Sequence, residues 1–206
     1  NKNDLRNFII FFIGQSLSQF GSTLTSFAIV IWAFTTTGKV MTSSMLAVCN
    51  TIPYLFVSLF GGSVVDRKNK KTIMLICDLI AALSTLVIII CLQLNSMEIW
   101  ILYIINAISG LMNAFQNPAS QVVITMLVEK QNFVKFGGLQ TTVNSMLSIF
   151  APIMATGLIS IGGLEIVLII DLCTFLFAFL TLLFLVKIPE KKLTNDTRFW
   201  DVVLDI

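Results

Sequence analysis

Hydrophobic residues occupy long stretches of this chain, and short polar breaks separate them. A helix that crosses the hydrocarbon layer of a membrane needs about 20 mostly apolar residues. The stretches of that length predict six membrane spans, with a further segment, residues 188–206, after them. The fold class expected is therefore an all-α, polytopic membrane helix bundle. The predicted spans are Phe8–Phe34, Thr42–Val65, Thr72–Gln93, Glu98–Pro118, Phe136–Ile161 and Glu165–Lys187.

Composition supports a membrane protein and excludes several kinds of chemistry. The chain has 206 residues, of which 56% are hydrophobic and 12% charged, about half the charged fraction of a soluble domain. It contains no histidine, which removes His-based catalytic dyads and His-ligated metals. The four cysteines lie in separate apolar runs without a CxxC pair, so they predict packing thiols. We expect no enzyme activity, no metal site and no cofactor.

The charges predict the orientation of the bundle. The net charge is +2, and the basic residues do not form one basic face, so nucleic acid is not an expected partner. All but Lys39 of the 13 lysines and arginines lie before the first predicted span, at or beyond the end of the sixth, or in the second–third and fourth–fifth loops. Cationic loops stay on the cytoplasmic side. Both termini are therefore expected to be cytoplasmic.

The third and sixth predicted spans resemble each other. Ile73–Leu79 reads IMLICDL and Ile166–Leu172 reads IVLIIDL, which places Asp78 and Asp171 at the same position. A repeat of three spans would insert its second copy upside down, and inverted three-helix repeats are typical of secondary transporters. The alternative is a chance alignment, because leucine and isoleucine dominate both helices.

A charged motif lies between the second and third predicted spans, where Gly62–Lys71 reads GSVVDRKNKK. An acid followed by clustered cations can contact the end of a neighbouring helix. The alternative is a positive loop that only fixes topology. The motif resembles the cytoplasmic loop signature of the major facilitator superfamily, roughly G-x-x-x-D-R-x-x-R/K-R/K. The matching residues are Gly62, Asp66, Arg67, Lys70 and Lys71.

Other segments resemble the macrolide-efflux type of drug exporter within that superfamily. They are Gly14–Ser18, Ala114–Ala119, Ala151-Pro152 and Ile170-Asp171. The resemblance implies a bacterial plasma-membrane transporter with two six-helix halves, of which this chain would be the N-terminal one. Residues 188–206 would begin the linker to the C-terminal half, and this half alone should not transport. Gly62, Asp66, Arg67, Lys70 and Lys71 would form a cytoplasmic latch against the other half.

The sequence departs from the proton-coupled members of the superfamily at two places. Ser109 stands where many of them carry an arginine. Pro152 follows Ala151 instead of a glycine, and the nearest following glycine is Gly157. Proton antiport is therefore implied by the branch alone.

Two ionisable residues, Asp78 and Asp171, lie well inside predicted spans. Such groups are costly in a bilayer and are candidates for function. Asp78 is near the cationic loop, so it could pair with a loop lysine or arginine instead of coupling a proton. Asp171 has almost no cation on its side, and a buried carboxyl can hold a proton. It is the first candidate for proton coupling, and the alternative is a neutral Asp171 hydrogen-bonded to a neighbouring helix.

Polar uncharged residues recur at helical spacing on four predicted spans and predict a cavity. The same polar faces also include the side chains of Ser109, Gln116, Ser148, Thr23 and Thr51. With aromatic walls from Phe27, Trp32, Tyr54 and Phe115, such a cavity would suit small amphipathic substrates. The carboxamides expected to line it are Gln15, Gln19, Asn50, Asn106, Asn113, Gln140 and Asn144.

Other functions remain open on the sequence alone. The chain could be a stand-alone six-helix subunit that forms a homodimer or acts as a scaffold in the bilayer. If it is a transporter, the substrate could also be a siderophore or another metabolite.

Overall fold

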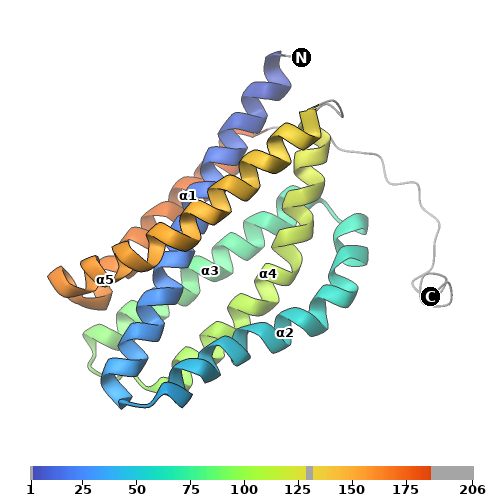
Figure 1. Ribbon diagram of the computed structural model, residues 1–206. Helices are drawn as coiled ribbons and strands as arrows, with labels where there is room; N and C mark the ends of the chain where they lie inside the picture. Colours follow the sequence, from blue (N-terminus) through green and yellow to red (C-terminus); the bar gives the residue numbers. More distant parts are fainter. Residues whose placement is uncertain (1, 129–131, 187–206) are drawn as a thin grey trace.

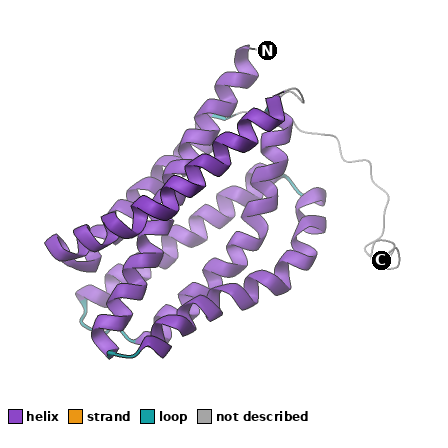
Figure 2. Cartoon of the chain, viewed as in Figure 1, coloured by secondary structure: helices purple, strands orange, loops and turns teal. Residues whose placement is uncertain are grey.

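The computed structural model describes residues 2–128 and 132–186, and these residues form helices without a strand (Figures 1 and 2). The predicted linker, residues 188–206, lies outside the described residues. The helices are α1 (Lys2–Thr37), α2 (Val40–Arg67), α3 (Lys70–Gln93), α4 (Ile99–Leu127) and α5 (Phe133–Leu180), followed by a π-helical turn, Thr181–Leu185. The all-α fold predicted from the sequence is confirmed for the described residues.

Five helices of the described part are long and apolar enough to cross a membrane. The fifth, Phe133–Leu185, consists of α5 and the π-helical turn, and it covers the fifth predicted span and most of the sixth. Its backbone is not helical at Gly162 and Gly163. Gly163 has a φ of 71°, a backbone conformation that glycine adopts readily and residues with a side chain rarely adopt. Figure 1 shows α5 turning back on itself partway along its length, at the left of the view. The break falls between the two predicted spans, Phe136–Ile161 and Glu165–Lys187.

The predicted end of the fourth span is wrong, because α4 continues past Pro118 to Leu127. Proline cannot donate the hydrogen bond that the carbonyl of Ala114 would receive in a regular helix. In the structure this carbonyl faces α2, where a Cβ added to Gly61 would lie 2.8 Å from the Ala114 oxygen. Close contact with a neighbouring helix lets a membrane helix tolerate a proline.

Buried apolar side chains form two clusters toward opposite ends of the bundle. One combines the second half of α1 and the start of α4, for example Leu24 and Leu102. The other combines the start of α1 and the end of α4, for example Phe8 and Val123. Asp78 and Asp171 lie along α3 and α5 between residues of these clusters. The bundle therefore has an apolar cluster toward each end, and the two buried aspartates lie between the clusters.

Glycines let α1 approach α5 at the depth of Asp171. A Cβ added to Gly21 would lie 2.7 Å from Asp171 Oδ1 and would also collide with the hydroxyl of Thr174. Two helical turns earlier on α1, a Cβ added to Gly14 would lie 2.7 Å from the Thr181 hydroxyl. Small residues allow membrane helices to pack this closely. The packing holds Asp171 against the backbone of α1.

Candidate functional site

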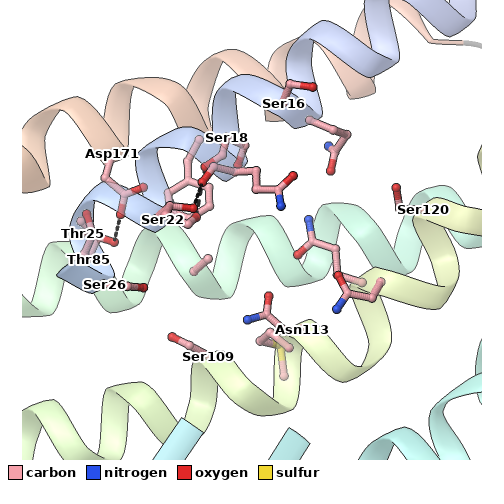
Figure 3. A pocket seen from close by; sticks show the side chains of 18 of the residues that line it. Ser16, Ser18, Ser22, Thr25, Ser26, Thr85, Ser109, Asn113, Ser120 and Asp171 are labelled. Atoms are coloured by element: carbon pink, nitrogen blue, oxygen red, sulfur yellow. Dashed lines mark hydrogen bonds between the residues drawn. The ribbon is translucent and has the colours of Figure 1, made fainter. Parts of the chain in front are cut away.

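A cavity of about 660 Å³ opens between the helices, and its wall is mostly polar. Ten carboxamides, ten hydroxyl side chains and Asp171 line it, together with ten apolar residues. The polar side chains come from α1, α3, α4 and α5, with Asn50 from α2. Figure 3 shows hydroxyls of α1, Asn113 and Ser109 of α4, and Asp171 around the same space. No lysine or arginine lies in the described wall.

All seven carboxamides predicted from the helical spacing line this cavity. Two of them are used within the protein, because Asn50 Nδ2 donates to Asn106 O at 3.2 Å and Asn106 Nδ2 donates to Leu102 O at 2.9 Å. Gln116 also lines the cavity and donates to Asp78. The remaining carboxamides of the wall have no hydrogen bond to the described protein. These unbonded carboxamides are Gln15, Gln19, Asn113, Asn117, Gln121, Gln140 and Asn144.

Two of them, Asn117 and Gln121, were missed by the sequence reasoning, as was Ser120 on the same helix. Asn113, Asn117 and Gln121 repeat at intervals of four residues, which keeps them on one helix face. This spacing runs straight across Pro118. The spacing therefore indicates that the helix continues beyond the proline. It was overlooked because the predicted span ended at Pro118.

The predicted aromatic walls are wrong. Phe27, Trp32, Tyr54 and Phe115 do not line the cavity, whereas Phe11, Phe12 and Phe175 do. Phe27 is exposed on the outside of the bundle, and Trp32 and Phe115 pack against the two apolar clusters. An aromatic side chain of a membrane helix can be stable either facing the lipid or packed against neighbouring helices. Their presence in a span therefore did not locate the cavity.

Two hydroxyls from the predicted polar faces also lie elsewhere. Ser148 donates to the backbone oxygen of Ser145, and Thr51 is exposed outside the cavity wall. Serine and threonine can satisfy their hydroxyl on their own helix, so they need not face a polar space.

Asp171 is the carboxyl group of the described wall, and it is 1% exposed. Its Oδ2 accepts a hydrogen bond of 3.2 Å from Thr85 Oγ1, drawn in Figure 3. Its Oδ1 and the hydroxyl oxygen of Thr25 are buried and have no hydrogen-bond partner. Thr25 and Thr85 were not singled out from the sequence.

Asp78 is also 1% exposed but does not line the cavity. The sequence suggested a loop lysine or arginine as its partner. In the structure Asp78 Oδ1 instead accepts from Gln116 Nε2 at 2.7 Å, and its Oδ2 has no partner. Asp78 thus reaches the cavity wall only through Gln116.

The loop motif lies where α2 ends and α3 begins. Gly62, Asp66 and Arg67 belong to α2, and the side chains of Asp66 and Arg67 lie outside the description. Asn69 caps α3 by accepting from the backbone N–H groups of Lys71 and Thr72. Lys70 is the first residue of α3.

Lys71 binds the end of the π-helical turn, Thr181–Leu185. Its Nζ donates to Leu183 O at 3.0 Å and to Val186 O at 2.8 Å. The last carbonyls of a helix have no partner within the helix, and a cation there is favourable. Lys71 therefore joins α3 to the π-helical turn within this chain, besides any role in the predicted latch.

We expect Lys71→Met to destabilise the protein by about 1–2 kcal/mol, because it removes two charge-assisted hydrogen bonds that are partly open to solvent. The midpoint of thermal unfolding of the purified complete protein would measure this loss. Lys68→Met is the matched control, since Lys68 is an exposed lysine of the same loop. Equal midpoints for the two variants would contradict a structural role for Lys71.

Comparisons with known proteins agree with this architecture. The family model of the Major Facilitator Superfamily matches residues 11–203. Macrolide efflux protein A of Streptococcus pyogenes is 29% identical over 89% of this chain and 45% of its own length. The protein of the same name from Enterococcus faecalis is 30% identical over 73% of this chain and 47% of its length. The Uncharacterized MFS-type transporter YkuC of Bacillus subtilis is 25% identical over 95% of this chain and 45% of its length.

The chain spans about half the length of the curated relatives it matches. No solved structure matches it significantly. The match to the family model covers nearly the whole chain, including most of α1, all of α2 to α5 and the residues that line the polar cavity. The chain therefore belongs to the Major Facilitator Superfamily.

Proposed function

We propose that this chain is the N-terminal half of a secondary active exporter of small amphipathic compounds, similar to the macrolides named in its relatives. The observation that carries the proposal is the polar cavity within a bundle of apolar helices. Polar faces inside a membrane protein need either partners or water. Here unbonded carboxamides leave donors and acceptors for a substrate.

The proposed mechanism is alternating access between two six-helix halves. The curated relatives are about twice as long as the part this chain matches, which supports a second half as partner. In this mechanism the fifth and sixth predicted spans cross the membrane separately, on either side of the break at Gly162 and Gly163. The two halves of the chain then form inverted repeats, and both termini are cytoplasmic in a bacterial plasma membrane.

The latch and the coupling site complete this proposal. The predicted latch lies at the junction of α2 and α3, contacts the other half and stabilises one state; its residues are Gly62, Asp66, Arg67, Lys70 and Lys71. Lys71 also holds the end of the π-helical turn, Thr181–Leu185. Asp171 carries the coupled proton. Its support is its place in the cavity wall, its burial and its unpartnered Oδ1. Asp78 is the second candidate, because it reaches the wall through Gln116.

The test is uptake of a radiolabelled macrolide into inside-out membrane vesicles that contain the complete transporter. We expect uptake when the vesicle interior is acidic and none after an ionophore collapses the pH gradient. Vesicles without the transporter are the control. Uptake equal to that control would contradict the proposed function.

A further inference from the structure

The unbonded carboxamides suggest which part of a substrate this half of the cavity binds. They occur as pairs or triplets at intervals of four residues: Gln15 and Gln19 on α1, Asn113, Asn117 and Gln121 on α4, and Gln140 and Asn144 on α5. Residues four apart share a helix face. Three helices therefore each present a row of carboxamides to one space.

Each carboxamide carries a carbonyl acceptor beside an NH₂ group with two donors. Seven such groups in the described wall make no hydrogen bond to the protein, and ten serine and threonine side chains stand among them. The described wall contains no lysine or arginine, and its carboxyl group, Asp171, is 1% exposed. The wall thus offers a surface that is nearly uncharged and rich in both donors and acceptors.

An apolar or flat aromatic occupant would displace water from these carboxamides without replacing its hydrogen bonds. A buried polar group that loses its partner carries the full cost of desolvation. An anion would find no fixed cation in the described wall. A group with several neighbouring hydroxyls is uncharged, and each hydroxyl is both a donor and an acceptor. Such a group can therefore hydrogen-bond to several of the carboxamides at once. Sites built on hydrogen bonds reject analogues that lack them.

We propose that the half-cavity between α1, α4 and α5 binds a polyhydroxylated, saccharide-like group of the substrate. This inference rests on the proposed function, because it concerns the same cavity, and it specifies the chemistry that the cavity recognises. Such a group can be the sugar of a glycosylated amphipathic compound or a free saccharide. The apolar part of an amphipathic substrate then contacts other surfaces.

Equilibrium binding to the purified complete transporter tests this inference. The probes are a radiolabelled macrolide that carries sugars and its aglycone, which has the same ring without sugars. We expect the glycoside to bind at least about tenfold more tightly, since two neutral hydrogen bonds already supply that ratio. Equal binding of the two probes would overturn the proposal.

Substitutions within the wall make the test specific. Asn144→Leu and Gln140→Met remove one carboxamide each at similar volume, and each should lower the preference for the glycoside over the aglycone about fivefold. Gln93→Met is the matched control, because Gln93 lies at the end of α3 outside the cavity wall. A preference that survives in both wall variants would overturn the proposal.

Competition with sucrose separates the two sources of the saccharide. Displacement of the glycoside by millimolar sucrose would identify a free saccharide as sufficient, and no displacement would assign the site to the sugar of a larger compound. The binding experiment and the transport experiment can also fail independently of each other. A transporter that prefers the glycoside in binding but does not move it into vesicles would contradict the proposed export and leave this inference standing.

Discussion

Asp171→Asn is expected to reduce pH-driven export by the complete transporter to the level of vesicles without it. Asparagine has nearly the shape of aspartate, and its carbonyl can still accept from Thr85 as Asp171 Oδ2 does. It cannot gain or lose a proton at neutral pH. The packing of Gly21 against this position should therefore survive while the coupling is lost. Uptake of a radiolabelled macrolide into inside-out vesicles under an imposed pH gradient is the measurement.

Exchange of labelled for unlabelled substrate without a gradient separates coupling from folding. Asp171→Asn should keep this exchange, because alternating access with bound substrate does not require the coupled proton to be released. Asp78→Asn is the matched control, since Asp78 is as deeply buried but does not line the cavity. We expect it to retain most of the gradient-driven uptake. Undiminished uptake by Asp171→Asn would remove Asp171 from the coupling mechanism.

The spacing of polar residues located the cavity because the physics involved is local. A carboxamide inside an apolar helix must face a partner or water, and residues three or four apart face the same way. Gln15, Gln19, Gln140 and Asn144 could therefore be placed on the wall from their positions alone. The same reasoning was weaker for hydroxyls, as Ser148 shows, because they can bond to their own helix.

The partners of the buried carboxyls could not be predicted, because they depend on contacts between helices. Asp78 is close in sequence to four cationic residues, yet it bonds to Gln116 on α4. Thr85 lies on α3 and reaches Asp171 on α5. Close approaches between helices, such as those at Gly21 and Gly61, determine which residues of two helices are in contact. No periodicity within a single span contains that information.

Gly110→Leu is expected to prevent the complete transporter from folding into a monodisperse protein. A Cβ at residue 110 would collide with the backbone oxygen of Asn50 and would lie 2.9 Å from its carbonyl carbon. The new side chain would collide with the backbone of Asn50, which cannot move aside as a side chain could. The helices α2 and α4 would therefore have to separate. Their separation would also break the hydrogen bond from Asn50 to the Asn106 carbonyl in the cavity wall.

Gly110→Ala should show the same effect in milder form. Overpacking costs about 1–3 kcal/mol, whereas replacing glycine by alanine in a helix returns about 1 kcal/mol, so we expect a net loss near 1 kcal/mol and a lower thermal midpoint. Gly157→Ala is the control, because a Cβ there meets nothing within 4 Å, and it should raise the midpoint. Size-exclusion chromatography and thermal unfolding of the purified variants would measure both effects. A stabilising Gly110→Ala would mean that α2 and α4 are not packed at this glycine, and the wall they form around Asn50 and Asn106 would have to be rebuilt.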